Sequence, residues 1–265
     1  MRIGFIAEND LPTIELDALF AREHGLAGLE FNHWGSFKDL TTDYIAQMRA
    51  ILDKYGVRCS TLGLWGWNHT SPDAAERAAA QHELGRLVEF GWILGAETLI
   101  TSAGRVPGAS AAENVEAFAQ VFPPYLEAID AAGMRLSVYA VHGNTFTEAV
   151  ADFEALWERF PGVGIKFDPA NFQHAGLDYL GFLRDHADKV FHVHIKEHLY
   201  HEGKLVSQPA AGMGDIAWGK VMAFLHEADY RGYLTIEPHG PLWSRGDLRR
   251  RNILLSQRYI SQFLV

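Results

Sequence analysis

An α/β fold closed into an eight-stranded barrel is predicted from two features of the sequence. Short β-type runs alternate with longer helix-type stretches along the chain, which is typical of βα units around a parallel sheet. These units number about eight, which favours closure of the sheet into a (β/α)8 TIM barrel. The expected strands cover residues 2–7, 27–31, 57–63, 97–103, 134–140, 163–168, 190–196 and 233–237.

The segments between these strands carry helix signals. Ser71 and Pro72 predict the start of the third helix, as a side-chain cap followed by a proline at the first helical position, and Gly95 predicts its end. Apolar residues recur at i, i+3, i+4 and i+7 in two later segments, which predicts helix faces packed on the sheet. They are Phe146, Val150, Phe153, Leu156 and Trp157, then Trp218, Val221, Met222 and Leu225. The longest stretch expected to be irregular covers residues 197–215.

An open, doubly wound sheet is the alternative architecture. Such sheets usually bind cofactors with a Gly-x-Gly-x-x-Gly motif after the first strand or with a P-loop, and neither motif occurs in this sequence. A TIM barrel of roughly 250 residues accounts for the whole length. We therefore expect one TIM-barrel domain over residues 1–265.

The composition narrows the class of partner. With 23 Lys and Arg against 33 Asp and Glu, the formal net charge is −10, which disfavours nucleic acid and anionic membranes as partners. The single cysteine, Cys59, excludes an internal disulfide, and its place in an apolar run predicts a buried thiol rather than a nucleophile. No apolar stretch reaches the length of a membrane span, and residues 2–7 are strand-like rather than typical of a signal peptide. We expect a soluble, cytoplasmic protein.

Three polar residues end three successive strands of the expected barrel. Asp168, His194 and Glu237 follow or close the strands at 163–168, 190–196 and 233–237. Because catalytic residues of TIM barrels lie at the carboxyl ends of the strands, we expect these side chains to converge at the barrel mouth. Two carboxylates and an imidazole suit Mn²⁺, Mg²⁺, Co²⁺ or Zn²⁺. The sequence therefore predicts a divalent-metal site.

Three segments in the last third of the chain have a distinctive order and spacing. They are His192-Val193-His194-Ile195-Lys196-Glu197, Gly212-Met213-Gly214-Asp215-Ile216-Ala217-Trp218 and Tyr230-Arg231-Gly232-Tyr233-Leu234-Thr235-Ile236-Glu237. Together they resemble the closing signature of the xylose isomerase-like TIM barrels. This family includes sugar isomerases and epimerases of the tagatose-epimerase and hydroxypyruvate-isomerase type, with inosose dehydratase as a relative. The resemblance covers nearly the whole chain.

The resemblance implies a divalent metal cofactor, with Mn²⁺ the first expectation. In this family the metal is held by a Glu, an Asp, a His and a Glu from strands five to eight, and the last three fall on Asp168, His194 and Glu237. Tyr139 occupies the position of the first ligand, the Glu from strand five, so this ligand is missing here. His142 is then a candidate for a fourth ligand, or for an acid or base with a pKa near neutrality. Tyr139 itself could donate a hydrogen bond to a developing oxyanion.

The resemblance also implies the type of reaction. In the epimerases, two glutamates on opposite faces of the substrate remove and return the proton α to a carbonyl, and Glu237 is one of them. We expect an isomerase or epimerase acting on a free sugar, keto-sugar or cyclitol. Elimination needs only one base, so the absence of a glutamate at Tyr139 makes a lyase of the inosose dehydratase type the alternative. A sugar-binding relative without catalysis is the second alternative.

Four further residues are expected to contact the substrate. Lys196 shares a strand face with His194 by the period of two, and either binds substrate or pairs with a carboxylate such as Glu197. The others are Glu30 at the end of the second strand, Asn171 and Trp67. The partner is thus a small carbohydrate, not nucleic acid or membrane. The sequence leaves the oligomeric state open, and members of this family are often homo-oligomers.

Overall fold

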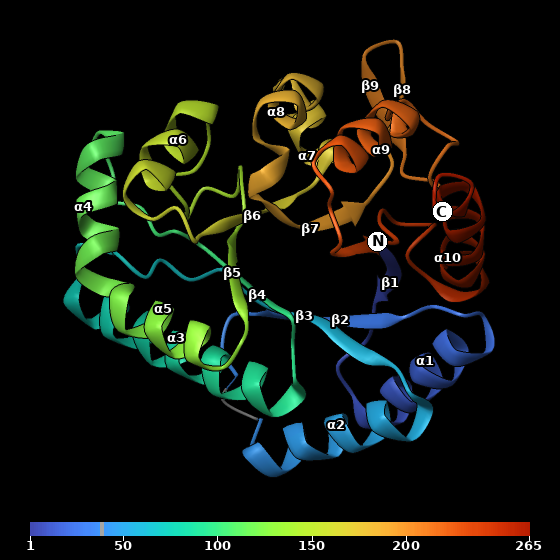
Figure 1. The fold of residues 1–265 in the computed structure, drawn as a ribbon, viewed down its shortest axis with the longest axis horizontal. Coiled ribbons are helices and arrows are strands. Elements are labelled where there is room, and N and C mark those ends of the chain that lie inside the picture. Colours follow the sequence, from blue (N-terminus) through green and yellow to red (C-terminus); the bar gives the residue numbers. More distant parts are fainter. Residues whose placement is uncertain (38–39) are drawn as a thin grey trace.

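The computed structural model describes residues 1–37 and 40–265, and its strands close into a ring (Figure 1). The eight strands of the ring follow the order β1-β10-β7-β6-β5-β4-β3-β2, each parallel to its neighbours. Their bounds are β1 Arg2–Ile6, β2 Gly28–Trp34, β3 Arg58–Trp65, β4 Thr98–Thr101, β5 Arg135–Val138, β6 Gly164–Phe167, β7 Val190–Ile195 and β10 Tyr233–Ile236. This confirms the predicted (β/α)8 TIM barrel, and every expected strand is present.

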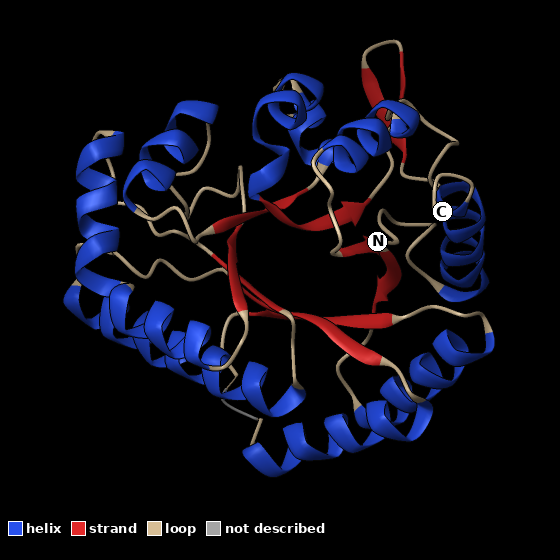
Figure 2. Cartoon of the chain, viewed as in Figure 1, coloured by secondary structure: helices blue, strands red, loops and turns tan. Residues whose placement is uncertain are grey.

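Helices surround the ring of strands on its outer side (Figure 2). Their bounds are α1 Leu11–Glu23, α2 Thr42–Tyr55, α3 Ala74–Leu94, α4 Ala111–Val121, α5 Pro123–Ala131, α6 Val150–Arg159, α7 Pro169–His174, α8 Tyr179–His186, the 3₁₀ helix η1 Ala187–Lys189, α9 Trp218–Glu227 and α10 Gly246–Ser261. Within the described part of the chain, no helix is both long and apolar enough to cross a membrane.

Alternate residues of the strands face either the helices or the barrel interior. Phe5, Leu29 and Val193 are fully buried and belong to the large hydrophobic core. Glu30 and His194, on the alternate positions of β2 and β7, are also buried, although both are polar. The helix-facing layer therefore supplies most of the hydrophobic stabilisation, and the interior of the barrel holds polar side chains beside a small apolar cluster of Trp65, Ile100 and Tyr139.

The N-terminal cap of α3 lies two residues after the predicted one. Asp73, not Ser71, caps this helix, because its side chain accepts from the backbone N–H groups of Ala75 and Glu76. Pro72 therefore precedes the cap instead of occupying the first helical position. A carboxylate at the positive end of the helix is the stronger cap here. Gly95 ends the helix as predicted, in the left-handed conformation with φ of 65°.

The two predicted apolar stripes fall on α6 and α9. All four predicted residues of α9 are buried, which confirms that face. On α6, Phe153, Leu156 and Trp157 are buried, but Phe146 lies in the loop that precedes the helix. The prediction extended α6 too far because Phe146 is buried for another reason, as part of the loop that follows β5.

The stretch 197–215 is not irregular throughout, because it contains a two-stranded antiparallel hairpin. Its strands are β8 Leu199–His201 and β9 Lys204–Ser207, and the hairpin projects from the barrel in Figure 1. The stretch is anchored by Glu197, whose buried carboxylate accepts from the N–H groups of Gly212 (2.9 Å) and Ile216 (3.0 Å) and from the Trp218 indole (2.9 Å). Glu197 therefore serves this loop and is not the partner of Lys196.

Candidate metal centre

Three potential metal ligands meet at the carboxyl ends of β6, β7 and β10. Asp168 directly follows β6, His194 lies near the end of β7, and Glu237 directly follows β10. One ligand atom from each residue lies within 4.8 Å of the other two. The backbone N–H of Glu237 donates to the carbonyl of Ile195 at 3.0 Å, which places the Glu237 side chain beside β7. The structure therefore brings the three residues of the expected site together.

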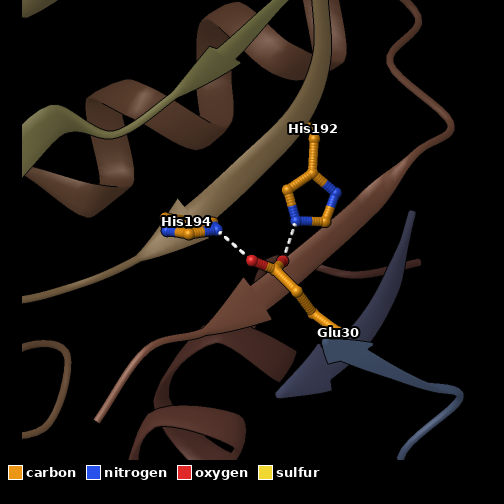
Figure 3. A group of neighbouring side chains, drawn as sticks. All are labelled: Glu30, His192 and His194. Atoms are coloured by element: carbon orange, nitrogen blue, oxygen red, sulfur yellow. Dashed lines mark hydrogen bonds and ion pairs between the residues drawn. The ribbon is translucent and has the colours of Figure 1, made fainter. Parts of the chain in front are cut away.

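His194 lies between two carboxylates. Its Nδ1 atom is 2.7 Å from Oε2 of Glu237 and 4.0 Å from Oδ2 of Asp168. Its Nε2 atom is 2.8 Å from Oε1 of Glu30 (Figure 3). Burial disfavours a charge on the imidazole, but the carboxylates of Glu30 and Glu237 prevail and raise the pKa of His194. Nδ1 is thus the nitrogen that faces the other two potential ligands.

Glu30 is fully buried beneath His194, and its oxygens accept four hydrogen bonds. Oε1 accepts from His194, and Oε2 accepts from Nε2 of His192 at 2.6 Å (Figure 3). Oε1 also accepts from Nδ2 of Asn32 at 2.7 Å, and Oε2 accepts from Oγ1 of Thr61 at 2.9 Å. Burial alone would raise the pKa of Glu30, but the two histidines hold it well below its usual value. Glu30, expected to contact substrate, is instead placed to orient His194.

The contacts of Glu30 run through the interior of the barrel. Glu30 lies on β2 and both histidines lie on β7, and these two strands are not neighbours in the sheet. The Glu30–His192 hydrogen bond joins residues 162 positions apart in the sequence. The side chains of His192 and Glu30 are 1% and 0% exposed, so this network is closed to solvent.

Two buried ammonium groups contact the carboxylates of the site. Nζ of Lys166 lies 3.1 Å from Oδ2 of Asp168. Nζ of Lys196 lies 3.3 Å from Oε1 of Glu237 and 3.9 Å from Oδ2 of Asp168, and it donates to Oδ1 of Asn171 at 3.1 Å. Although burial disfavours the charged form, Glu237 and Asp168 raise the pKa of Lys196. The lysines thus neutralise the carboxylates of the potential metal site.

Both carboxylates are ionised at neutral pH. Burial raises the pKa of Asp168, but the ammonium groups of Lys166 and Lys196 outweigh it and lower that pKa below its ordinary value. Burial opposes ionisation of Glu237 as well, but Lys196 and the neighbouring imidazoles hold its pKa well below the ordinary value. Each group is therefore available as an anionic ligand or as a base.

Asp168 also caps a helix. It precedes α7, and its Oδ1 atom accepts from the backbone N–H of Asn171 at 3.0 Å. Pro169 occupies the first helical position, where no N–H is needed. The cap uses Oδ1 and leaves Oδ2 directed at the two lysines, so the cap and the potential ligand are different oxygens of one carboxylate. The same turn places the half-buried Asn171 beside Lys196.

Tyr139 packs into an aromatic stack at the edge of the site. Its ring lies 4.4 Å from that of Trp65, with the planes 11° apart, and Trp34 stacks on Trp65 at 5.4 Å. The Tyr139 hydroxyl accepts from Nδ2 of Asn144 at 2.7 Å. Burial raises the pKa of Tyr139 to about 12, so the phenol stays protonated at neutral pH. The stack ends at Trp34, which is 69% exposed.

His142 and Trp67 lie on loops around this stack. His142 is half-buried and sits edge-on to Trp65 and Tyr139, 5.2 Å from each ring centre. Burial, and then the cations of the two lysines, lower the pKa of His142 to about 4, below the near-neutral value expected from the sequence. Trp67 is half-buried, and its indole N–H donates to the carbonyl of Gly35.

Lys166 is the residue that the sequence analysis missed. A period-two signal could have found it, because Lys166 precedes Asp168 by two positions and so shares its face of the strand. A lysine within an apolar strand segment is unusual unless it is paired. Here the pairing with Asp168 accounts for its burial.

The order and chemistry of these residues agree with a match to a protein-family model. The model described as "Xylose isomerase-like TIM barrel" matches residues 18–256. The chain belongs to the xylose isomerase-like TIM barrel family. No curated protein matches the chain in sequence.

Solved structures share the fold of this family member over its full length. A xylose isomerase domain protein from Planctomyces limnophilus is 22% identical, with a TM-score of 0.75 over 99% of this chain and 96% of that chain. A 3-keto-D-glucoside 4-epimerase from E. coli is 15% identical, with a TM-score of 0.76 over 99% of both chains. The IOLI protein, solved with a bound zinc atom, is 15% identical, with a TM-score of 0.77 over 100% of this chain and 99% of that chain.

Proposed function

We propose that this protein is a divalent-metal-dependent isomerase or epimerase that removes a proton α to the carbonyl of a free sugar, keto-sugar or cyclitol. The observation that carries the proposal is the convergence of Asp168, His194 and Glu237 within 4.8 Å at the barrel mouth. Membership of a family that includes sugar isomerases supports it. Relatives of the same fold include an L-ribulose 3-epimerase and a D-psicose 3-epimerase, which act on small sugars.

The donor set fits a divalent cation. Asp168 and Glu237 supply anionic oxygens and His194 supplies Nδ1, a combination that suits Mn²⁺, Mg²⁺, Co²⁺ or Zn²⁺. The hydrogen bond from Nε2 of His194 to Glu30 is the type of second contact that orients metal-binding imidazoles. The zinc atom bound to the IOLI protein also supports a divalent metal. When bound, such an ion polarises a carbonyl and its neighbouring hydroxyl.

Glu237 is the residue we assign as the base. Its side chain is 14% exposed, whereas those of Asp168 and His194 are 3% and 2% exposed, so it is the most open of the three to a substrate. Its carboxylate is held by His194 at 2.7 Å and by Lys196 at 3.3 Å, which fixes its orientation. Because its pKa lies well below the ordinary value, it is deprotonated at neutral pH, which is the state that a base requires.

Other side chains around the site are assigned to the substrate. Lys196 and Asn171 form a pair of polar groups beside Glu237 that can bind sugar oxygens. His142 is neutral at neutral pH and is the candidate for the second acid or base. Trp67, on the loop that follows β3, is the candidate for packing against the apolar face of a sugar.

A lyase is the second candidate, and the placement of Tyr139 favours it. Tyr139 stacks on Trp65, its hydroxyl is held by Asn144, and its pKa is about 12, so it is not a base at neutral pH. Elimination requires one base and a hydroxyl leaving group, whereas epimerisation requires proton transfer at both faces. Glu237 can take the α proton and, once protonated, give that proton to the leaving hydroxyl, so that water is released.

Metal analysis and solvent deuterium together test this proposal. Asp168→Ala, His194→Ala and Glu237→Ala should each lower the metal content of folded protein, while Tyr139→Glu adds a carboxylate and should not. An isomerase or epimerase incorporates deuterium from D₂O into a full-length sugar, and a lyase releases a dehydrated product. Binding of a sugar with neither exchange nor dehydration, in excess Mn²⁺, would instead identify a non-catalytic sugar-binding protein.

A further inference from the structure

The carboxylates of the buried cluster are in contact with basic side chains of the same cluster. Glu30, Asp168 and Glu237 supply three carboxylates. Opposite them lie the ammonium groups of Lys166 and Lys196 and the imidazole of His194, which two of these carboxylates contact. A divalent cation placed among Asp168, His194 and Glu237 therefore enters a site whose carboxylates are already paired with ammonium groups.

Lys166 is the cation in closest contact with Asp168. Its Nζ atom lies 3.1 Å from Oδ2 of Asp168, the oxygen that the helix cap leaves free, and this oxygen is also the one nearest Nδ1 of His194. Both side chains of the pair are 3% exposed, so little solvent screens the interaction. The ammonium group of Lys166 thus contacts Oδ2, the oxygen of Asp168 that is available to a metal ion.

The surroundings of Lys166 hold it at this position. Its ammonium group lies 5.4 Å from the centre of the Trp65 ring, a distance suited to a cation–π interaction. Trp65 is 4% exposed and is fixed between Trp34 and Tyr139 in the aromatic stack. Tyr139 therefore supports the Trp65 ring that Lys166 contacts, and it adds no carboxylate to the site.

From this geometry we propose that Lys166 competes with the divalent metal for Asp168, so that the metal binds weakly and reversibly in the wild-type protein. The inference rests on the proposed metal site and deepens it. Two like charges a few ångströms apart in a poorly screened site repel strongly, and the repulsion doubles for a divalent ion. Lys196, whose Nζ atom lies 3.3 Å from Oε1 of Glu237, competes with the metal for that carboxylate in the same way.

Titration with Mn²⁺, followed by the electron paramagnetic resonance signal of the free ion, measures this competition without substrate. Lys166→Met keeps the length and apolar stem of the side chain and removes its charge, and it should bind Mn²⁺ roughly tenfold more tightly or better. Lys196→Met should tighten binding in the same direction, which keeps the test valid if Lys166→Met does not fold. Lys204→Met, on the exposed strand β9, changes the net charge equally and should leave the affinity unchanged.

The outcomes separate the two proposals. Tighter Mn²⁺ binding by Lys166→Met, or by Lys196→Met where Lys166→Met does not fold, with Lys204→Met unchanged, supports the competition. Equal affinities in wild type and in folded Lys166→Met overturn the competition and leave the metal site standing. An absence of Mn²⁺ binding in wild type and in both site variants overturns the metal site as well.

Discussion

His194 donates from Nε2 to Oε1 of Glu30 at 2.8 Å, and this hydrogen bond determines which nitrogen of the imidazole faces the barrel mouth. Because Nε2 is hydrogen-bonded to the Glu30 carboxylate, Nδ1 is the nitrogen that faces Glu237 and Asp168. The candidate site therefore depends on a residue from β2, a strand that carries none of the three potential ligands.

The first prediction concerns this support. Glu30→Gln removes the charge that faces both His192 and His194 while preserving the size of the side chain. Loss of such an outer carboxylate typically weakens metal binding by roughly 10- to 100-fold, and we expect a loss of that size for Mn²⁺. Calorimetric titration of the folded variant measures it. Glu227→Gln, exposed at the end of α9, is the matched control. Unchanged affinity in Glu30→Gln would refute the orienting role.

The second prediction concerns the anchor of the loop between β7 and α9. Glu197→Ala leaves the N–H groups of Gly212 and Ile216 and the indole of Trp218 without their acceptor. Leaving a buried donor without its acceptor costs about 1–3 kcal/mol, and we expect a loss of at least this size in the free energy of unfolding. Urea denaturation measures it. Glu197→Gln retains one acceptor oxygen and should lose less; an equal loss would argue against the hydrogen bonds as the cause.

The third prediction concerns the contact between β1 and β2. A Cβ atom on Gly4 would lie 2.5 Å from the carbonyl oxygen of Gly28, closer than real Cβ contacts. Backbone cannot move aside as a flexible side chain can, so Gly4→Ala should destabilise the protein by about 1–3 kcal/mol. Gly162→Ala is the control, because a Cβ there meets no atom within 4 Å. Thermal unfolding of both variants tests this, and equal melting temperatures would contradict the proposed clash.

The fourth prediction concerns pH. His69 is fully buried, with Nδ1 3.1 Å from the carbonyl of Ala80 and Nε2 2.8 Å from the hydroxyl of Thr101. Burial lowers its pKa from 6.5 to about 4. Between these values the unfolded chain binds a proton that the folded protein does not, so stability falls as the pH drops through this window. The full effect is about 3 kcal/mol.

His69→Gln removes the titrating imidazole and introduces an amide that can still form hydrogen bonds. Its free energy of unfolding should therefore fall less than that of the wild type between pH 7 and pH 4.5. Urea denaturation at several pH values gives both curves. Parallel curves for the two proteins would mean that His69 does not contribute to the acid sensitivity.

The sequence alone was sufficient for the fold and for the meeting of Asp168, His194 and Glu237. Alternation of strand and helix signals is local, and eight βα units close into a barrel whose strand ends converge. Three polar residues at successive strand ends are therefore neighbours whatever the details of packing. The burial of Cys59 was predictable for the same kind of reason, since it lies within an apolar strand segment, and the structure confirms it.

Local signals were less reliable where several residues could serve the same purpose. Ser71 and Asp73 both suit a helix cap, and a local pattern does not show which of them caps the helix; in the structure Asp73 accepts the two N–H bonds. The hairpin between Leu199 and Ser207 was missed because its strands are short, and Glu197 secures the stretch through partners up to 21 residues away.

Tertiary structure decided what lies beneath and beside the three ligands. Glu30 reaches His192 and His194 only because the sheet closes into a ring, in which β1 and β10 separate β2 from β7. That closeness depends on strand tilt and register rather than on any local pattern. The pairing of Lys166 with Asp168, and the stacking of Tyr139 on Trp65, arise in the same way. The sequence determined which residues reach the mouth of the barrel. Their charges and partners follow from the closure of the sheet, because closure brings together side chains that are remote along the chain.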